Sequence, residues 1–294
     1  MATIALRRAE PGVVAATTRD RALLRGFLER DRLLAAYAIC DLDEREFART
    51  RCAVARDPDG SVIAVGVEYS GPSPQPLFLM GSDAGVGAIL RDVLRPRIAF
   101  IAAPPTGLAA VQRHYHLDPG PPMVRMGVTD ATFRDADDPG VERLGPADTP
   151  ELNRLYRLGF GSWLPAQSVA DGVYYGLRIR GRIVAAAGTH IVSRSARLAV
   201  VGNVMTAAEF RGHGYAKAVT AAVTAELLGF CDDVVLNVRA DNPPALNAYR
   251  RIGYSEHVRY DERLARRTGS LLGELAAALR RRLIEAETRE PNRR

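Results

Sequence analysis

The stretch at 209–219, EFRGHGYAKAV, places two glycines, an arginine and a histidine directly before an alanine-rich helical pattern. Glycine weakens helices, so two glycines at a helix start need a structural reason. One reason is a tight turn. The other is an anion-binding site, because the first amides of a helix lack partners, the helix dipole is positive there, and missing Cβ atoms let phosphate oxygens reach the backbone. Taken alone, the stretch leaves both interpretations open.

Two well-known phosphate-binding motifs are excluded by local detail. A dinucleotide-binding fold needs GxGxxG after the first strand of a parallel sheet, with an acidic residue after the next strand. A P-loop ends in Gly-Lys-Ser/Thr. Neither pattern occurs around 209–219.

The elements on either side of this stretch predict a mixed sheet covered by helices. Thr149 followed by Pro150 is typical of a helix start, and Asn242, with two prolines after it and Gly253 further on, marks a second short helix. Apolar and turn residues predict strands within 172–193 (with a turn at Gly181), 196–206, 232–238 and 257–264, and a helix with Val219, Val223 and Leu227 on one face. The order of helix, antiparallel strands, helix, strand, helix and strand defines an α/β fold.

A second motif follows the glycine stretch. The run Arg211 to Ala216 fits Arg/Gln-x-x-Gly-x-Gly/Ala, and Asn242, Tyr249 and Gly253-Tyr254 follow about thirty residues later, after a buried strand. Together these motifs resemble the GNAT superfamily of acyl-CoA-dependent N-acyltransferases. The resemblance covers 141–262 well. The joint match of two motifs in order is far more specific than either motif alone.

The first half carries a faint copy of the second. Segment 101–115, IAAPPTGLAAVQRHY, aligns with 240–254, ADNPPALNAYRRIGY, so that Ala103 replaces Asn242 and Ala110 replaces Tyr249. Chance similarity of Pro- and Ala-rich strings is the alternative. The layout resembles glycine-acyltransferase-type and similar tandem GNAT proteins. We predict tandem GNAT-like domains, each a mixed β-sheet flanked by helices: a degenerate copy at 1–130, a linker at 131–140, a catalytic domain at 141–262 and an arginine-rich C-terminal helix or tail at 263–294.

The resemblance implies a set of residues that bind acetyl-CoA or another acyl-CoA as co-substrate, with no metal. Backbone groups of a splayed strand would pair with the pantetheine arm, the amides of the glycine turn and the arginine before it would hold the pyrophosphate, and an asparagine would contact the cofactor. The cofactor-binding residues are Val204, Met205, Thr206, Arg211, Gly212, His213, Gly214, Tyr215, Ala216, Lys217 and Asn242. Tyr249 would lie beside the sulfur as the catalytic residue.

Several of these residues have a structural alternative. Asn242 also suits a helix cap, Tyr249 a packing aromatic, and His213 and Lys217 solvated side chains. His190 lies either in an acceptor pocket or in a strand with its hydrogen bonds satisfied. Trp163, Tyr174 and Tyr175 belong either to an acceptor pocket or to the core.

The resemblance implies direct attack of a neutral amine on the thioester, with an amide near Met205 as oxyanion donor and Tyr249 as proton donor to the leaving thiolate. Some family members use a glutamate on the strand before the Asn motif as base, but Asn237 stands there. Glu209 is expected to point outward from the turn. The base therefore stays unassigned, with a water chain or His190 as candidates.

Composition argues against nucleic acid or membrane as partners. The chain has 294 residues and a net charge of +6, of which the nine arginines and four glutamates of 263–294 supply five charges, so the body carries no broad basic field. No apolar run of about 18 residues or secretory signal occurs. Cys40, Cys52 and Cys231 lack metal or redox spacing and are typical of reduced thiols. We expect a cytoplasmic protein.

The tail predicts a helix from about Ser270 with an apolar face of five leucines, at 271, 272, 275, 279 and 283. That face packs against its own body or against a second copy, so a homodimer stays open.

Two functions of different classes remain. One is an acyl-CoA N-acetyltransferase acting on a primary amine of a small molecule or amino acid. The other is a non-catalytic acyl-CoA-binding regulatory module. The presence of Asn242 and Tyr249 in the second copy, and their absence from the first, favours the enzyme.

Overall fold

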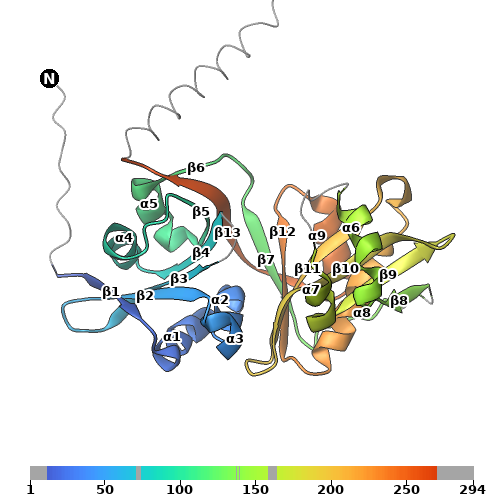
Figure 1. Ribbon diagram of the computed structural model, residues 1–294, viewed down its shortest axis with the longest axis horizontal. Coiled ribbons are helices and arrows are strands. Elements are labelled where there is room, and N and C mark those ends of the chain that lie inside the picture. Colours follow the sequence, from blue (N-terminus) through green and yellow to red (C-terminus); the bar gives the residue numbers. More distant parts are fainter. Residues whose placement is uncertain (1–11, 71–73, 137, 139, 158–163, 270–294) are drawn as a thin grey trace, which may run out of the picture. The chain divides into compact units, whose positions relative to one another are not determined.

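The computed structural model describes residues 12–70, 74–136, 138, 140–157 and 164–269. These residues fall into two compact units (Figure 1). Unit 1 takes its described residues from 1–27, 49–120 and 261–269, and unit 2 takes them from 28–48 and 121–260. Both units are therefore discontinuous in sequence. The predicted tail helix from Ser270 and Trp163 lie outside the described residues.

Unit 2 is a mixed sheet with the strand order β13-β7-β12-β11-β10-β9-β8. Neighbouring strands are antiparallel except for β11 and β12, which are parallel. Its strands are β7 (Met123–Val128), β8 (Val141–Arg143), β9 (Tyr174–Ile179), β10 (Arg182–Ser193), β11 (Leu198–Thr206), β12 (Asp233–Arg239) and residues 255–260 of β13 (Ser255–Arg267).

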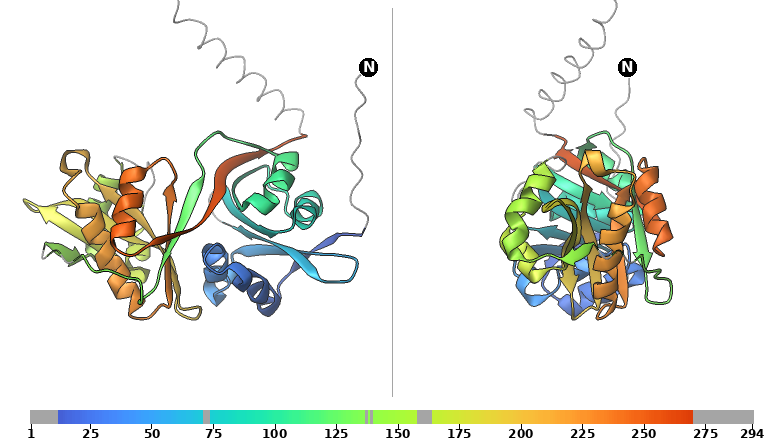
Figure 2. Two further views of the ribbon diagram at one scale, coloured as in Figure 1. Left: turned by 180° about the vertical axis from the view of Figure 1, so that it is seen from behind. Right: turned by 90° about the vertical axis from the view of Figure 1, so that its right-hand side faces the viewer.

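Helices cover both faces of this sheet, as the right-hand view of Figure 2 shows. The helices α8 (Tyr215–Leu228) and α9 (Pro243–Arg251) lie on one face, and α6 (Thr149–Arg157) and α7 (Ala166–Asp171) lie on the other. Two short N-terminal helices, α2 (Ala36–Cys40) and α3 (Glu44–Phe47), also belong to unit 2, and short 3-10 helices form at Glu29–Asp31, Pro146–Asp148 and Ala208–Phe210.

The core of unit 2 lies mainly under α8. Val219, Val223 and Leu227 are fully buried, as their spacing predicts, and they pack with apolar residues of the central strands. Complete burial of a Val or Leu side chain contributes about 1.5–3 kcal/mol. The helix begins at Tyr215, directly after the two glycines of the glycine stretch.

Unit 1 repeats this order of elements. Its sheet runs β1-β2-β3-β4-β5 and then residues 261–267 of β13, to which β6 also pairs. Strands β4 and β5 are parallel, as β11 and β12 are, and a helix follows each of them. The elements are β1 (Val14–Thr18), α1 (Arg21–Leu28), β2 (Thr50–Arg56), β3 (Val62–Tyr69), β4 (Gln75–Gly81), α4 (Asp83–Asp92), β5 (Ile98–Ala103), α5 (Pro105–His114) and β6 (Tyr115–Leu117).

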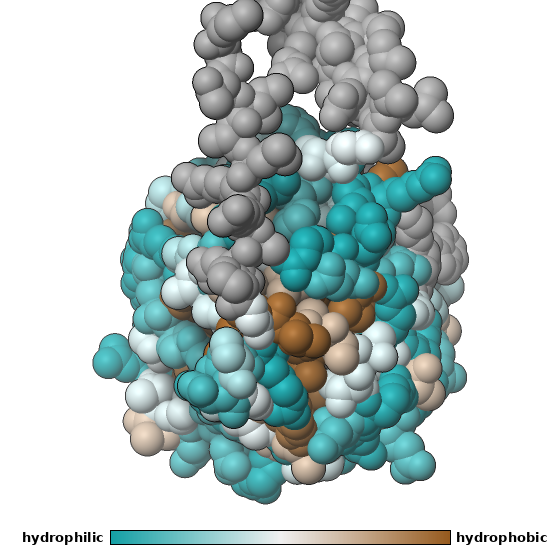
Figure 3. All heavy atoms as spheres, turned by 90° about the vertical axis from the view of Figure 1, so that its left-hand side faces the viewer, coloured by the Kyte–Doolittle hydropathy of each residue, from teal (hydrophilic) through white to brown (hydrophobic). Residues whose placement is uncertain are grey.

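The face that Figure 3 shows is mostly hydrophilic, and its strongest hydrophobic colour forms a band near the centre. No helix among the described residues is long and apolar enough to cross a membrane. The predicted linker at 131–140 is followed directly by β8, in which Arg143 lies opposite Tyr175 of β9.

We expect Gly253→Ala to destabilise the protein far more than Gly181→Ala. Both glycines have a left-handed φ, +98° and +76°, which costs any other residue about 1–3 kcal/mol. A Cβ at Gly253 would also lie 2.1 Å from the carbonyl oxygen of Thr132, whereas a Cβ at Gly181 would meet no atom within 4 Å. Urea unfolding should show an extra loss of at least about 2 kcal/mol for Gly253→Ala. Equal losses would contradict this account.

Candidate functional site

The parallel strands β11 and β12 separate partway along their length. They pair from Leu198 to Val201 on β11, opposite Asp233 to Leu236 on β12, and the pairing then stops. The rest of β11 pairs only with β10. Edge backbone groups of a strand without a neighbour are available to another chain or ligand. The predicted residues Val204, Met205 and Thr206 lie in this splayed segment and are half-buried.

The β10–β11 hairpin has two bulges near the point where β11 and β12 separate. Ala186 pairs with Met205 and Gly188 with Gly202, which leaves one extra residue in β11, and Asn203 has a φ of +52°. Further along β10, His190 is an extra residue between Thr189 and Ile191. Bulges bend a strand and change the direction of its side chains. The bend therefore begins at Asn203, directly before the splayed segment.

The glycine stretch forms an open, left-handed turn at the start of α8. Gly212 and Gly214 both have φ +84°, and a Cβ at either position would meet no atom within 4 Å. Gly214 is the N-cap of α8 and offers no side chain to its amides. Among the described residues, no hydrogen-bond partner is found for the amides of Gly212 to Lys217. Unpartnered amides at a helix N-terminus, with no Cβ atoms in the way, are able to bind an anion.

Side chains around the turn are exposed or half-buried. The Arg211 Nε donates to the carbonyl oxygen of Thr206 at 3.3 Å, which holds the arginine beside the end of β11. The His213 ring stacks on the Tyr215 ring at 5.4 Å between centroids. The half-buried Lys217 and Ala216 lie in the first turn of the helix. The predicted residues 211–217 are therefore brought together around the free amides.

The equivalent turn of unit 1 is filled by protein atoms. Ser82 caps α4 by accepting from the Gly85 amide at 3.2 Å. A Cβ at Gly81 would lie 2.3 Å from the Ile63 carbonyl oxygen, and one at Gly85 would lie 2.6 Å from the Ala64 Cβ. The first turn of α4 thus has less room for an anion than the first turn of α8.

Asn242 and Tyr249 both belong to α9. The Asn242 Oδ1 accepts from the Ala245 amide at 3.3 Å, so the residue is a helix cap, and its side chain is exposed. Tyr249 is 7% exposed and packs 6.2 Å from the Tyr254 ring. Burial raises the pKa of Tyr249 to about 12. Its hydroxyl has no hydrogen-bond partner within the described part of the chain, which leaves it free to donate to a ligand.

The remaining candidates are Glu209, Asn237, Tyr174 and Tyr175, and they differ in burial and in hydrogen bonding. Glu209 is exposed and pairs with Arg182 at 3.5 Å, as its expected outward direction requires. Asn237 follows the last β12 residue that pairs with β11. Tyr174 is fully buried and donates to the Thr189 carbonyl oxygen at 2.9 Å, whereas Tyr175 is half-buried.

Sequence reasoning missed the contact of His190 with the N-terminal segment. The Tyr37 hydroxyl of α2 lies 2.5 Å from His190 Nδ1. The two residues are 153 positions apart, and neither belongs to a local motif. Since contacts of this range follow from the tertiary fold, no feature of the sequence could have indicated this one.

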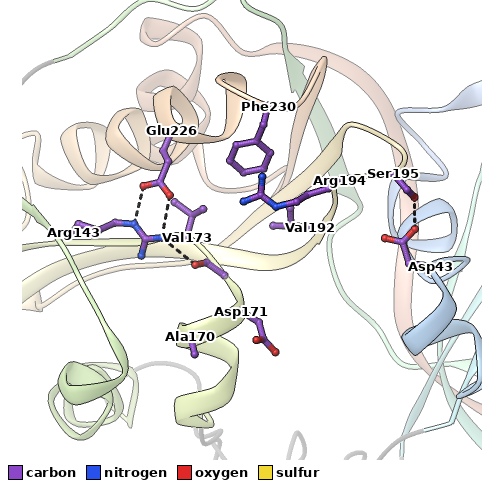
Figure 4. Close-up of a pocket in the computed structure, with 11 residues that line it drawn as sticks. Asp43, Arg143, Ala170, Asp171, Val173, Val192, Arg194, Ser195, Glu226 and Phe230 are labelled. Atoms are coloured by element: carbon purple, nitrogen blue, oxygen red, sulfur yellow. Dashed lines mark hydrogen bonds and ion pairs between the residues drawn. The ribbon is translucent and has the colours of Figure 1, made fainter.

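A separate hollow of about 400 Å³ lies near the C-terminal end of α8 (Figure 4). Glu226 and Arg143 line it as a direct ion pair, with Arg143 Nε 2.7 Å from Glu226 Oε2. The Arg194 guanidinium lies 4.0 Å from the Phe230 ring centroid. Burial raises the pKa of Glu226, but hydrogen bonds from Arg143 and Tyr175 outweigh it and lower the pKa overall. Glu226 is twelve residues beyond Gly214, about 18 Å along a helix. The hollow is therefore separate from the glycine turn.

No group of three or more metal-ligating side chains occurs among the described residues.

Residues 138–254 match the model of the acetyltransferase (GNAT) family. Among curated proteins, none matches the chain.

Solved structures of GNAT proteins match much more of the chain. A putative acetyltransferase from Novosphingobium aromaticivorans is 23% identical, with 74% of this chain and 89% of that chain covered and a TM-score of 0.51. A GCN5-related N-acetyltransferase from Sphaerobacter thermophilus is 16% identical, with 90% and 99% covered and a TM-score of 0.58. A tandem GNAT protein from the clavulanic acid biosynthesis pathway is 13% identical, with 88% and 98% covered and a TM-score of 0.51.

The chain therefore has a GNAT fold, and residues 138–254 carry the sequence pattern of the acetyltransferase (GNAT) family. This confirms the predicted fold class for the chain and the predicted family resemblance for residues 138–254. The glycine-acyltransferase type and the degeneracy of the first copy stay predictions.

We expect Asn242→Ala to lower the free energy of unfolding by about 1 kcal/mol and Asn242→Asp to lower it by much less. The Oδ1 of Asn242 accepts from the Ala245 amide, and aspartate offers an oxygen at the same place. Thermal unfolding of both variants measures the difference. Equal stabilities for Asn242→Ala and the unaltered protein would show that the cap contributes nothing.

Proposed function

We propose that the protein is an N-acyltransferase that moves an acetyl or other acyl group from acyl-CoA to a primary amine of a small molecule or amino acid. The observation that carries the proposal is the open turn at 212–217, with its free amides and two left-handed glycines. Such a turn binds a diphosphate through the backbone. Residues 138–254 match the acetyltransferase (GNAT) family, and this match supports acyl-CoA as the ligand that carries the diphosphate.

The splayed segment of β11 supplies the second part of the site. Val204, Met205 and Thr206 lie between the bulge at Asn203 and the glycine turn. Their free edge would accept the amide-bearing pantetheine arm by strand-like pairing. We propose that the Met205 amide donates a hydrogen bond to the thioester oxygen, whose negative charge grows as the amine attacks.

Tyr249 is our choice of partner for the leaving sulfur. Burial raises its pKa to about 12, so the phenol stays protonated at every pH of ordinary enzyme assays. A free thiol has a pKa of about 8.5. Complete transfer of the phenol proton to a thiolate is therefore unfavourable, and Tyr249 instead donates a hydrogen bond that stabilises the thiolate as the C–S bond breaks.

A non-catalytic acyl-CoA-binding module is the second candidate. It needs the glycine turn but has no need for a buried phenol without a partner, such as that of Tyr249. Calorimetry with acetyl-CoA, combined with thiol-release assays across a panel of primary amines, separates the two. Binding without release for every amine would favour the module.

We expect Gly214→Val to weaken acetyl-CoA binding by at least about 100-fold. The valine would occupy open space at the turn and would not adopt φ +84° without strain. Gly181→Val is the matched control, because Gly181 has φ +76° and open surroundings but lies in the β9–β10 turn. Calorimetric titration of both variants is the measurement. Equal affinities would mean that the glycine turn is structural only.

We expect Tyr249→Phe to lower kcat by about 10²–10³-fold, the range typical of losing one hydrogen-bond donor to a developing negative charge. The dissociation constant of acetyl-CoA should change by only a few-fold, because the ring and its packing remain. Tyr254→Phe is the control, since it removes a neighbouring phenol that is 2.8 Å from Thr224 Oγ1. An unchanged kcat for Tyr249→Phe would assign that residue to packing alone.

The raised pKa of Tyr249 also determines how its contribution to turnover changes with pH. A phenol whose pKa is raised to about 12 is protonated below that pH, so its contribution to turnover is present there and is lost only as the pH rises through about 12. Any loss of kcat between pH 8 and 10 must then come from another group. The loss should be the same in Tyr249→Phe and in the unaltered enzyme.

A further inference from the structure

The proposed acyl transfer lacks a group that takes the proton from the attacking amine. Glu209 is exposed and paired with Arg182, and Asn237 cannot act as a base. The described residues offer one imidazole beside the bulge of β11, that of His190.

His190 packs directly against the start of the splayed segment. A Cβ at Gly202 would lie 2.2 Å from His190 Nε2, so only glycine leaves room for the ring there. Asn203, the next residue, begins the separation of β11 from β12. His190 nevertheless keeps an exposed surface. The ring therefore lies at the border between the splayed strand and solvent.

Hydrogen bonds around His190 determine which nitrogen accepts a proton. Asn203 Nδ2 donates to the Tyr174 hydroxyl at 3.1 Å, which leaves the Asn203 oxygen for the imidazole. We therefore assign the hydrogen of His190 to Nε2, so that Nδ1 accepts from the Tyr37 hydroxyl 2.5 Å away. Tyr37 is only partly buried, and the guanidinium of the buried Arg125 lies 5.3 Å from its ring centroid and holds the ring in place.

We propose that Tyr37 and His190 form a proton relay for the acceptor amine. The inference rests on the proposed acyl transfer. The amine nitrogen forms its bond to the acyl carbon, and the C=O electron pair moves to oxygen. The nitrogen then loses its proton to Tyr37 Oη while the Tyr37 proton passes to His190 Nδ1. The carbonyl re-forms, the C–S bond breaks with its electron pair on sulfur, and His190 later releases its proton to water.

The charge state of His190 suits this role. In the described part of the chain, the phenols of Tyr37 and Tyr174 belong to its hydrogen-bond network, and the charged Arg125 guanidinium lies over the Tyr37 ring. Packing of protein atoms around the ring lowers the pKa of His190, and a hydrogen bond with Asn203 opposes this in part. His190 is therefore neutral at pH 7 and able to accept a proton. Turnover through the relay is lost as the pH falls through the lowered pKa and is present above it.

Tyr37→Phe and His190→Asn test the relay, with acetyl-CoA and the primary amine that releases thiol fastest in the unaltered enzyme. Each variant should lose about 10²-fold in kcat and keep its acetyl-CoA affinity within a few-fold. The double variant should lose no more than either single variant, because the two groups act as one unit. The acid limb of the kcat profile should disappear in both. His116→Asn, on β6, is the control and should keep full activity.

Two results would overturn the relay while acyl transfer stands: kcat of Tyr37→Phe within threefold of the unaltered enzyme, or additive losses in the double variant. Nuclear magnetic resonance of the imidazole gives a readout without turnover. It should show His190 neutral at pH 7.5 with its hydrogen on Nε2, and a charged ring would refute the proposal. Absence of thiol release for every amine in the unaltered enzyme would instead refute the acyl transfer, and the relay with it.

Discussion

The pairing of β11 with β12 stops after Val201, and the remaining features of the site depend on that interruption. The bulge at Asn203 turns β11 away, and the Asn203 side chain holds the bend through Tyr174. Because β11 leads into the glycine turn, the free strand edge and the free amides of α8 lie on consecutive segments of chain. A sheet that paired along its full length would have no edge to offer there, since ladder hydrogen bonds would satisfy every backbone group.

Local features of the site were predictable from sequence. The glycines at 212 and 214, the cap at Asn242 and the turn at Gly181 each follow from the chemistry of one or two residues, and the structure places all of them as expected. Long-range features were not predictable. The contact of Tyr37 with His190 joins residues 153 positions apart, and the assignment of 28–48 to unit 2 depends on packing rather than on any motif. The two bulges were missed because each changes the register by one residue without a change in hydrophobic pattern.

The two units show how similar element orders lead to different surfaces. Both have a strand, a helix and a parallel strand in succession, but Ser82 closes the first turn of α4 and Gly214 leaves that of α8 open. A side chain that satisfies its own helix removes the donors that an anion would use. The difference between the caps Ser82 and Gly214 supports a single ligand site per chain, although the two units share the same order of elements.

The single strand β13 serves both units, with residues 255–260 in unit 2 and 261–267 in unit 1. A ribosome makes that strand last among the described elements, so the sheet of unit 1 lacks one of its members until all of unit 2 has been synthesised. The N-terminal half of a nascent chain must therefore wait with an unfilled strand position, open to chaperones or to wrong pairing. Unit 2 in turn needs residues 28–48, from the earliest part of the chain. The two units mature together, and neither can be inherited, excised or exchanged as one uninterrupted stretch of gene.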